Sequence, residues 1–146
     1  MLSPSTVFEW ANTAALAAWL LLIIIPNLSV TRWLVRSGIV SLVLAVFYAI
    51  YLFSNFDPAG FEAFNSLEGI MSLNNKPELA LAGWIHYLVF DLFVGIWEVG
   101  NARKLGIPHW LIIPALIFTF MLGPVGLMLY FLTRSLYLKR WISEPV

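Results

Sequence analysis

Three ionisable side chains, His86, Asp91 and Glu98, lie within one apolar segment of membrane length, Leu79–Val99. Such groups are costly at membrane depth, so they are rare there and usually face protein or trapped water. Asp91 lies near the middle of the segment, where burial favours the neutral, protonated carboxyl group. A neutral carboxyl group can donate a proton, which suits a general acid. The alternative for Asp91 is a hydrogen bond to a neighbouring helix, without catalysis.

Helical geometry separates these three candidates. Asp91 and Glu98 are two turns apart, about 10 Å along a helix axis, so they cannot form a close carboxylate pair. His86 and Asp91 point to different sides of the helix, so an acid–base pair needs a substrate, a water or another helix between them. His86 is the candidate base, and the alternative is that it packs at the edge and bonds a backbone carbonyl group. Glu98 is expected to pair with a basic loop residue at the interface.

Two other apolar segments add polar or irregular positions. Asn12 is expected to form a hydrogen bond across helices, with Asp91 as its partner. Gly123, Pro124 and Gly126 predict a kink in the last segment, because proline removes a backbone donor and glycine allows close approach. The residues expected to contact a ligand are polar or aromatic and lie in the first, third and last apolar segments: Asn12, Trp84, Tyr87, Phe90 and Tyr130.

The composition excludes several classes of protein. Of 146 residues, 61% are hydrophobic and 11% are charged, whereas soluble domains carry about 25% charged residues. A soluble core of this size cannot bury so much apolar surface, so the lipid bilayer is the expected solvent. Eight basic and eight acidic residues give no net charge and no basic stripe, which argues against nucleic acid. Without cysteine, and with two distant histidines, no metal site, haem or other cofactor is expected.

Four apolar segments are long enough to span a membrane. They predict an all-α integral membrane four-helix bundle in one domain, 1–146, with helices at about 7–25, 33–53, 79–99 and 110–132. The acidic, phenylalanine-rich segment 54–78 is expected to be an amphipathic interfacial segment, and the alternative is a plain surface loop. Lysine and arginine count four against four on the two sides, so orientation rests on a weak preference for the first and third loops inside.

Two runs of the sequence carry a family resemblance: GWIHYLVFDLFVG at 83–95 and MLGPVGLMLY at 121–130. Together they resemble the signature of a small membrane family that is named for abscisic acid deficiency and has a plant neoxanthin synthase as a member. The chain lacks a long extension that resembles a chloroplast transit peptide. It is therefore expected to be a bacterial-type member, located in a bacterial inner membrane.

The resemblance implies a reaction on a carotenoid end group, in which an epoxide is opened to an allenic alcohol. This isomerisation needs an acid and a base but no obligatory cofactor, and Asp91 and His86 are the expected pair. The expected partners are the bilayer and a carotenoid or other isoprenoid lipid, in a possible homo-oligomer. Two alternatives remain: a non-catalytic pigment- or quinone-binding membrane protein, and an oligomeric proton or small-solute pathway through Asp91.

Overall fold

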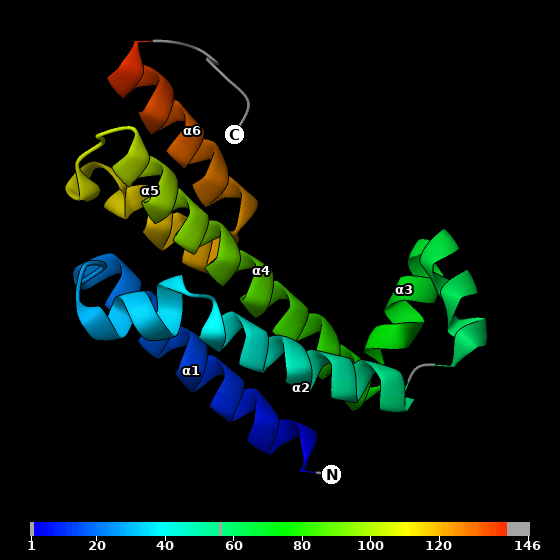
Figure 1. The fold of residues 1–146 in the computed structure, drawn as a ribbon. Coiled ribbons are helices and arrows are strands. Elements are labelled where there is room, and N and C mark those ends of the chain that lie inside the picture. Colours follow the sequence, from blue (N-terminus) through cyan, green and yellow to red (C-terminus); the bar gives the residue numbers. More distant parts are fainter. Residues whose placement is uncertain (1, 56, 140–146) are drawn as a thin grey trace.

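The fold is described by a computed structural model over residues 2–55 and 57–139. Within those ranges every regular element is a helix and none is a strand, which confirms the all-α prediction (Figure 1). The elements are α1 (Pro4–Ile24), the π-helix η1 (Thr31–Arg36), α2 (Ile39–Asn55), the 3₁₀-helix η2 (Pro58–Asn65), α3 (Leu67–Asn74), α4 (Pro77–Lys104), α5 (His109–Leu122) and α6 (Pro124–Leu138).

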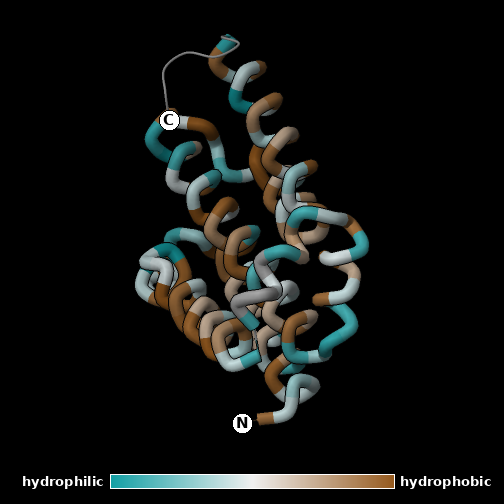
Figure 2. The backbone as a smooth tube through the Cα atoms, turned by 90° about the vertical axis from the view of Figure 1, so that its right-hand side faces the viewer, coloured by the Kyte–Doolittle hydropathy of each residue, from teal (hydrophilic) through white to brown (hydrophobic). Residues whose placement is uncertain are grey.

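Helices α1 and α4 are long and apolar enough to cross a membrane, whereas the apolar helices α2 and α5 are shorter. Both long helices begin with a proline, Pro4 or Pro77, because the first turn of a helix needs no amide donor. Ser3 caps α1 by accepting a hydrogen bond from the Thr6 N–H at 3.2 Å. The 28 residues of α4 extend over about 42 Å. Apolar residues occur along the length of these helices (Figure 2).

The three helices α1, α2 and α4 lie side by side and alternate in direction (Figure 1). Near the end of α2, the Tyr51 hydroxyl donates a hydrogen bond to the carbonyl oxygen of Leu2, just before α1, at 2.6 Å. The start of α1 and the end of α2 therefore lie at the same end of the molecule. Helix α4 packs closely on α1, because Gly95 leaves the space that the buried Trp19 ring fills.

The fourth expected helix, 110–132, is instead two helices that reverse at Gly123. Gly123 has φ of +46°, a conformation that favours glycine over residues with a Cβ. Gly126 of α6 lies directly against Thr119 of α5, so closely that a Cβ on Gly126 has no space. The predicted kink is therefore a complete reversal, because positive φ at a glycine before Pro124 ends α5 and starts α6 in a new direction.

Helices α5 and α6 thus form a hairpin that reaches only part of the way along α4. With 14 and 15 residues, each arm extends over about 21 to 23 Å, roughly half the length of α4. The start of α5 lies beside the end of α1, where an imidazole nitrogen of His109 bonds the Ile23 carbonyl oxygen at 2.8 Å. The described residues therefore do not confirm a bundle of four spanning helices.

Other boundaries also differ from expectation. The segment expected at 33–53 begins as a π-helix, and α2 starts only at Ile39, because Gly38 adopts φ of +84° between them. The central segment is helical, as η2 and α3, and no side chain of α3 is buried. Its exposed side chains include Leu67 and Met71, as an interfacial segment requires. Phe56 lies outside the described residues.

The hairpin also redistributes charge between the two ends of the fold. Helix α6 returns to the end where α1 and α4 finish, and that end carries most of the described basic residues: Arg32, Arg36, Arg103, Lys104, Arg134 and Lys139. Lys76 lies at the opposite end, with the acidic residues in and beside η2 and α3. The expected equal division of basic residues assumed that the last apolar segment crosses to the opposite end of the fold, whereas α6 turns back at Gly123.

Candidate functional site

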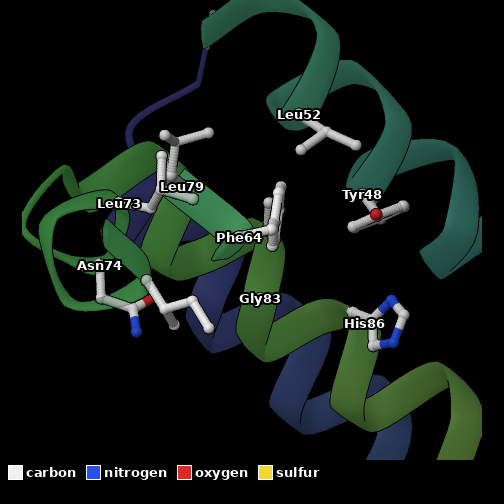
Figure 3. Close-up of a pocket in the computed structure, with 10 residues that line it drawn as sticks. Tyr48, Leu52, Phe64, Leu73, Asn74, Leu79, Gly83 and His86 are labelled. Carbon is white, nitrogen blue, oxygen red and sulfur yellow. The ribbon is translucent and has the colours of Figure 1, made fainter. Parts of the chain in front are cut away.

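A cavity of about 260 Å³ lies between α2, the start of α4 and the η2–α3 segment. Its lining is mostly apolar, and the residues are Tyr48, Leu52, Phe64, Ile70, Leu73, Asn74, Leu79, Ala82, Gly83 and His86 (Figure 3). Only Tyr48, Asn74 and His86 carry polar side chains. An apolar pocket with a few polar groups is the usual form of a small-molecule site.

The polar groups of the cavity are not spread evenly. Tyr48 and His86 lie together at one side of it, and Asn74 lies at the other (Figure 3). The Tyr48 and His86 ring centroids are 5.5 Å apart. The His86 ring in turn stacks on Phe90, one turn further along α4, at 4.6 Å. One turn before His86, Gly83 leaves open space, since a Cβ there meets no atom within 4 Å.

Asp91 lies on a different side of α4, against the tip of the α5–α6 hairpin. A Cβ on Gly123 would approach the Asp91 Oδ1 atom to 2.8 Å. Tyr87, one turn earlier on α4, is an electrostatic neighbour of the Asp91 carboxyl group, and the buried Oδ2 atom of Asp91 has no hydrogen-bond partner. Asp91 does not line the cavity that contains His86. The two expected catalytic residues are therefore not brought to one site.

Asn12 forms an interhelical hydrogen bond, but not with Asp91. Its Oδ1 atom accepts a hydrogen bond from the Trp84 indole N–H at 3.0 Å, and its Nδ2 atom donates to the Phe8 carbonyl oxygen at 2.8 Å. The Trp84 ring also lies 5.4 Å from the Tyr87 ring. The predicted Asn12–Asp91 bond is wrong, because Trp84 presents a closer donor from the face of α4 that contacts α1.

Glu98 does not form the expected interfacial ion pair. It is fully buried between α4 and α5, and its two carboxyl oxygens lie 3.0 and 3.1 Å from the Thr119 hydroxyl, which donates to them. The reason is length: α4 continues beyond the expected boundary, so Glu98 lies within the helix rather than at its end. Glu98 therefore joins α4 to the hairpin.

Tyr130 of α6 is also fully buried, which leaves no surface for a ligand. Its hydroxyl donates a hydrogen bond to the Asn101 Oδ1 atom at 2.7 Å, and its ring packs edge-on against Trp97 at 5.4 Å. None of the five residues expected to contact a ligand lines this cavity, although Phe90 stacks on His86, which does. Tyr130 instead holds α6 to α4.

Two residues at these sites have no role in the sequence-based hypothesis. Tyr48 is one of several aromatic residues in a long apolar run, and Thr119 is the one threonine of another. A polar atom within an apolar helix is the signal in the sequence for both.

In the part of the chain described, no group of three histidine, aspartate or glutamate side chains is placed to hold a metal ion.

Taken together, the described residues define a small all-helical protein with two helices of membrane-spanning length and an apolar cavity that contains one histidine. Within that class, the chain belongs to the ABA4-like family, described as ABA DEFICIENT 4-like, which matches residues 6–130. The matched region extends from α1 into α6 and includes both the cavity and the hairpin tip.

The chain is also similar to a plant protein, "Protein ABA DEFICIENT 4, chloroplastic" of Arabidopsis thaliana, with 26% identity over 141 residues. The match covers 90% of this chain, and the chain spans about 62% of the length of that relative. Because this relative is chloroplastic, the comparisons do not support a bacterial-type member or a bacterial inner membrane. No solved structure matches the chain.

Proposed function

We propose that this protein is an integral membrane isomerase that acts on the end group of a carotenoid or related isoprenoid lipid. The observation that carries the proposal is the cavity beside Tyr48 and His86, which combines an apolar lining with two adjacent polar rings. Membership of the ABA4-like family supports a substrate of the carotenoid class, because the family resemblance implies end-group chemistry.

The surface of the helices supports a location in the membrane. Large apolar side chains are exposed on several elements; Phe53 is 81% exposed, Leu42 66% and Met128 64%. Soluble monomers rarely expose extended apolar surface, whereas lipid acyl chains solvate it. Helices α1, α2 and α4 cross the bilayer in this proposal, and the α5–α6 hairpin enters it from one side.

The size of the cavity favours binding of an end group rather than a whole carotenoid. At about 260 Å³, it lies just below the usual range of pockets for drug-sized ligands, about 300 to 1,000 Å³. A cyclic end group enters the cavity, while the long polyene lies outside it against the apolar helix surface. The exposed Phe90 and Phe93 of α4, on the same side of the helix as His86, offer such a surface.

The proposed reaction is a proton-balanced isomerisation. One carbon–oxygen bond of an epoxide breaks, and the oxygen takes a proton and stays as a hydroxyl group. The neighbouring carbon loses a proton, and the electron pair of its C–H bond forms the new carbon–carbon double bond. We assign proton acceptance to the His86 imidazole and proton donation to the Tyr48 hydroxyl, since these two groups share the cavity. Transfer of the proton from His86 to Tyr48 restores both groups.

This assignment replaces Asp91 as the acid. Asp91 lies against Gly123 at the hairpin tip, on another side of α4, so a substrate in the cavity does not reach it. We propose that Asp91 is a positioning residue for the hairpin. Its unpartnered Oδ2 atom faces the start of α6, where the partial positive charge of the helix N-terminus favours a carboxylate.

The test uses purified protein in lipid nanodiscs with a panel of epoxycarotenoids, followed by chromatography and absorption spectra of the pigments. The wild type should form an isomer of unchanged mass. His86→Phe keeps an aromatic ring against Tyr48 and Phe90 but removes both nitrogens, and Tyr48→Phe removes one hydroxyl. Each should reduce turnover by about 10² to 10⁴-fold, as loss of general acid–base catalysis does, while pigment binding is retained.

A second candidate is a non-catalytic carrier of a pigment or quinone. The apolar lining favours it, because seven of the ten lining residues carry no polar side-chain group. Bound pigment with no turnover across the panel establishes this candidate and rejects the isomerase. Absence of both binding and turnover rejects both.

A further inference from the structure

Three arginines from two separate elements gather at the basic end of the fold. Arg32 and Arg36 belong to η1, in which the Ser37 N–H bonds the Arg32 carbonyl oxygen, five residues back, at 3.1 Å. Residues four apart lie on nearly the same side of such a helix, so both arginines face one region. Arg103 lies in the last turn of α4.

The core brings these two elements together. Val35 of η1 is fully buried, and it belongs to the same core cluster as Ala102 of α4. Each of these residues directly precedes one arginine, Arg36 or Arg103. The positive charges of Arg103 and Arg32 accordingly act on Arg36.

Arg36 lacks a counter-ion among the described residues. Its Nη1 atom is buried without a hydrogen-bond partner, and no ion pair joins Arg32, Arg36 or Arg103 to a carboxylate in the described ranges. Burial lowers the pKa of Arg36, and the like charges of Arg103 and Arg32 lower it further. A partly desolvated cation between two like charges is an unfavourable arrangement, which an anion would relieve.

The surroundings of this cluster indicate the source of the anion. Trp33, between the two arginines of η1, is 67% exposed, and Leu28 just before η1 is 50% exposed. Tryptophan beside basic residues is typical of the headgroup level of a membrane. Cationic and exposed apolar side chains therefore alternate on one short segment after the end of α1.

We propose that Arg32, Arg36 and Arg103 bind the phosphate group of an anionic membrane lipid. Guanidinium groups suit this ligand, because their planar forks bind phosphate oxygens in pairs. The acyl chains of the lipid lie against the exposed apolar side chains of the adjoining helices. The site lies about 25 Å along α4 from His86, so it is separate from the cavity, and it rests on the proposed membrane location alone.

The experiment uses the full chain in vesicles that contain phosphatidylcholine and a minor fraction of phosphatidylglycerol. Native mass spectrometry of the released protein measures which lipid stays bound. We expect phosphatidylglycerol to be enriched on the wild type. Arg36→Gln and Arg103→Gln should each reduce the enrichment by about tenfold, as loss of a charge-assisted phosphate contact does. The matched control is Lys139→Gln, which removes the same charge at the same end and should leave the enrichment unchanged.

Three results would overturn the proposal. No enrichment on the wild type rejects the site, and an equal loss in Lys139→Gln shows only diffuse attraction to anionic lipid. Binding of inorganic phosphate that displaces the lipid assigns the site to free phosphate instead. Flotation of every variant with the vesicles tests membrane location separately, so a failure of the lipid site is distinguished from a failure of the proposed membrane protein.

Discussion

The Tyr137 hydroxyl donates a hydrogen bond to the Gly106 carbonyl oxygen at 3.1 Å, across 31 positions of the sequence. If α5 and α6 were one continuous helix, these residues would be about 45 Å apart. The bond therefore requires the reversal at Gly123, and it places the end of α6 beside the start of α5. As a result, Lys139 lies at the opposite end of the fold from Ser3.

This arrangement predicts which segments face the same side of a membrane. The chain has no cysteine, so single cysteines introduced at Ser29, Asn65 and Lys139 report without interference. In sealed vesicles with a membrane-impermeant maleimide, Ser29→Cys and Lys139→Cys should label from the same side, and Asn65→Cys from the other. Labelling of Lys139→Cys together with Asn65→Cys would show four crossings and reject the hairpin.

The hairpin tip should tolerate no side chain at Gly123. Gly123→Ala places a Cβ 2.8 Å from Asp91 Oδ1 and holds alanine at positive φ, so it should destabilise the fold by about 1 to 3 kcal/mol. Gly100→Ala is the control, because it lies within α4 with nothing near its Cβ, and it should stabilise the helix by about 0.5 to 1 kcal/mol. Thermal unfolding in detergent measures the stability of both variants. Equal effects of the two substitutions would contradict the close packing of Gly123 on Asp91.

The buried bond between Glu98 and Thr119 should couple α4 to the hairpin. Thr119→Val removes the hydroxyl that donates to Glu98 and should lower the free energy of unfolding by about 1 to 3 kcal/mol, since it leaves a buried carboxyl group unsatisfied. Adding Glu98→Leu should then cause less loss than Glu98→Leu alone. A double-mutant cycle by denaturant unfolding measures this coupling, and strict additivity would show that the two groups do not interact.

Filling the cavity should prevent ligand binding without unfolding the protein. Gly83→Leu directs a side chain into open space beside His86 and replaces a poor helix former, so it should raise the melting temperature while pigment binding is lost. Gly100→Leu, at the other open glycine of α4, provides the control and should keep the pigment. Retention of pigment by Gly83→Leu would mean that the ligand binds elsewhere.

Asp91→Asn separates a catalytic role from a positioning role. The substitution keeps the size of the side chain but removes the acid, and because Asp91 is outside the cavity, turnover should fall by less than about threefold, within the range of an indirect effect. The melting temperature should fall, because the substitution alters the contact with Gly123, while turnover stays within that threefold limit. A loss of turnover as large as that of His86→Phe, with the fold intact, would restore Asp91 as the acid.

Much of the local structure could be predicted from residue types. The apolar runs predict helices because a buried backbone must satisfy its own hydrogen bonds, and GPVG marks the correct position for a break in the last run. The separation of His86 from Asp91 also follows from 3.6 residues per turn. The partners of Asn12 and Glu98 were predicted wrongly, since helical periodicity gives the face of a helix on which a residue lies but not the neighbour that covers it.

The sequence by itself determined that this chain is helical, apolar and marked by a few ionisable groups within apolar segments of membrane-spanning length. Only the tertiary structure decided that the break at Gly123 reverses the chain, because glycine before proline permits either a kink or a turn and packing of Gly126 on Thr119 selects the turn. That choice places most of the described basic residues at one end and buries Glu98 against Thr119. Packing of α2 on α4 likewise brings together Tyr48 and His86, which are distant in sequence and adjacent in space.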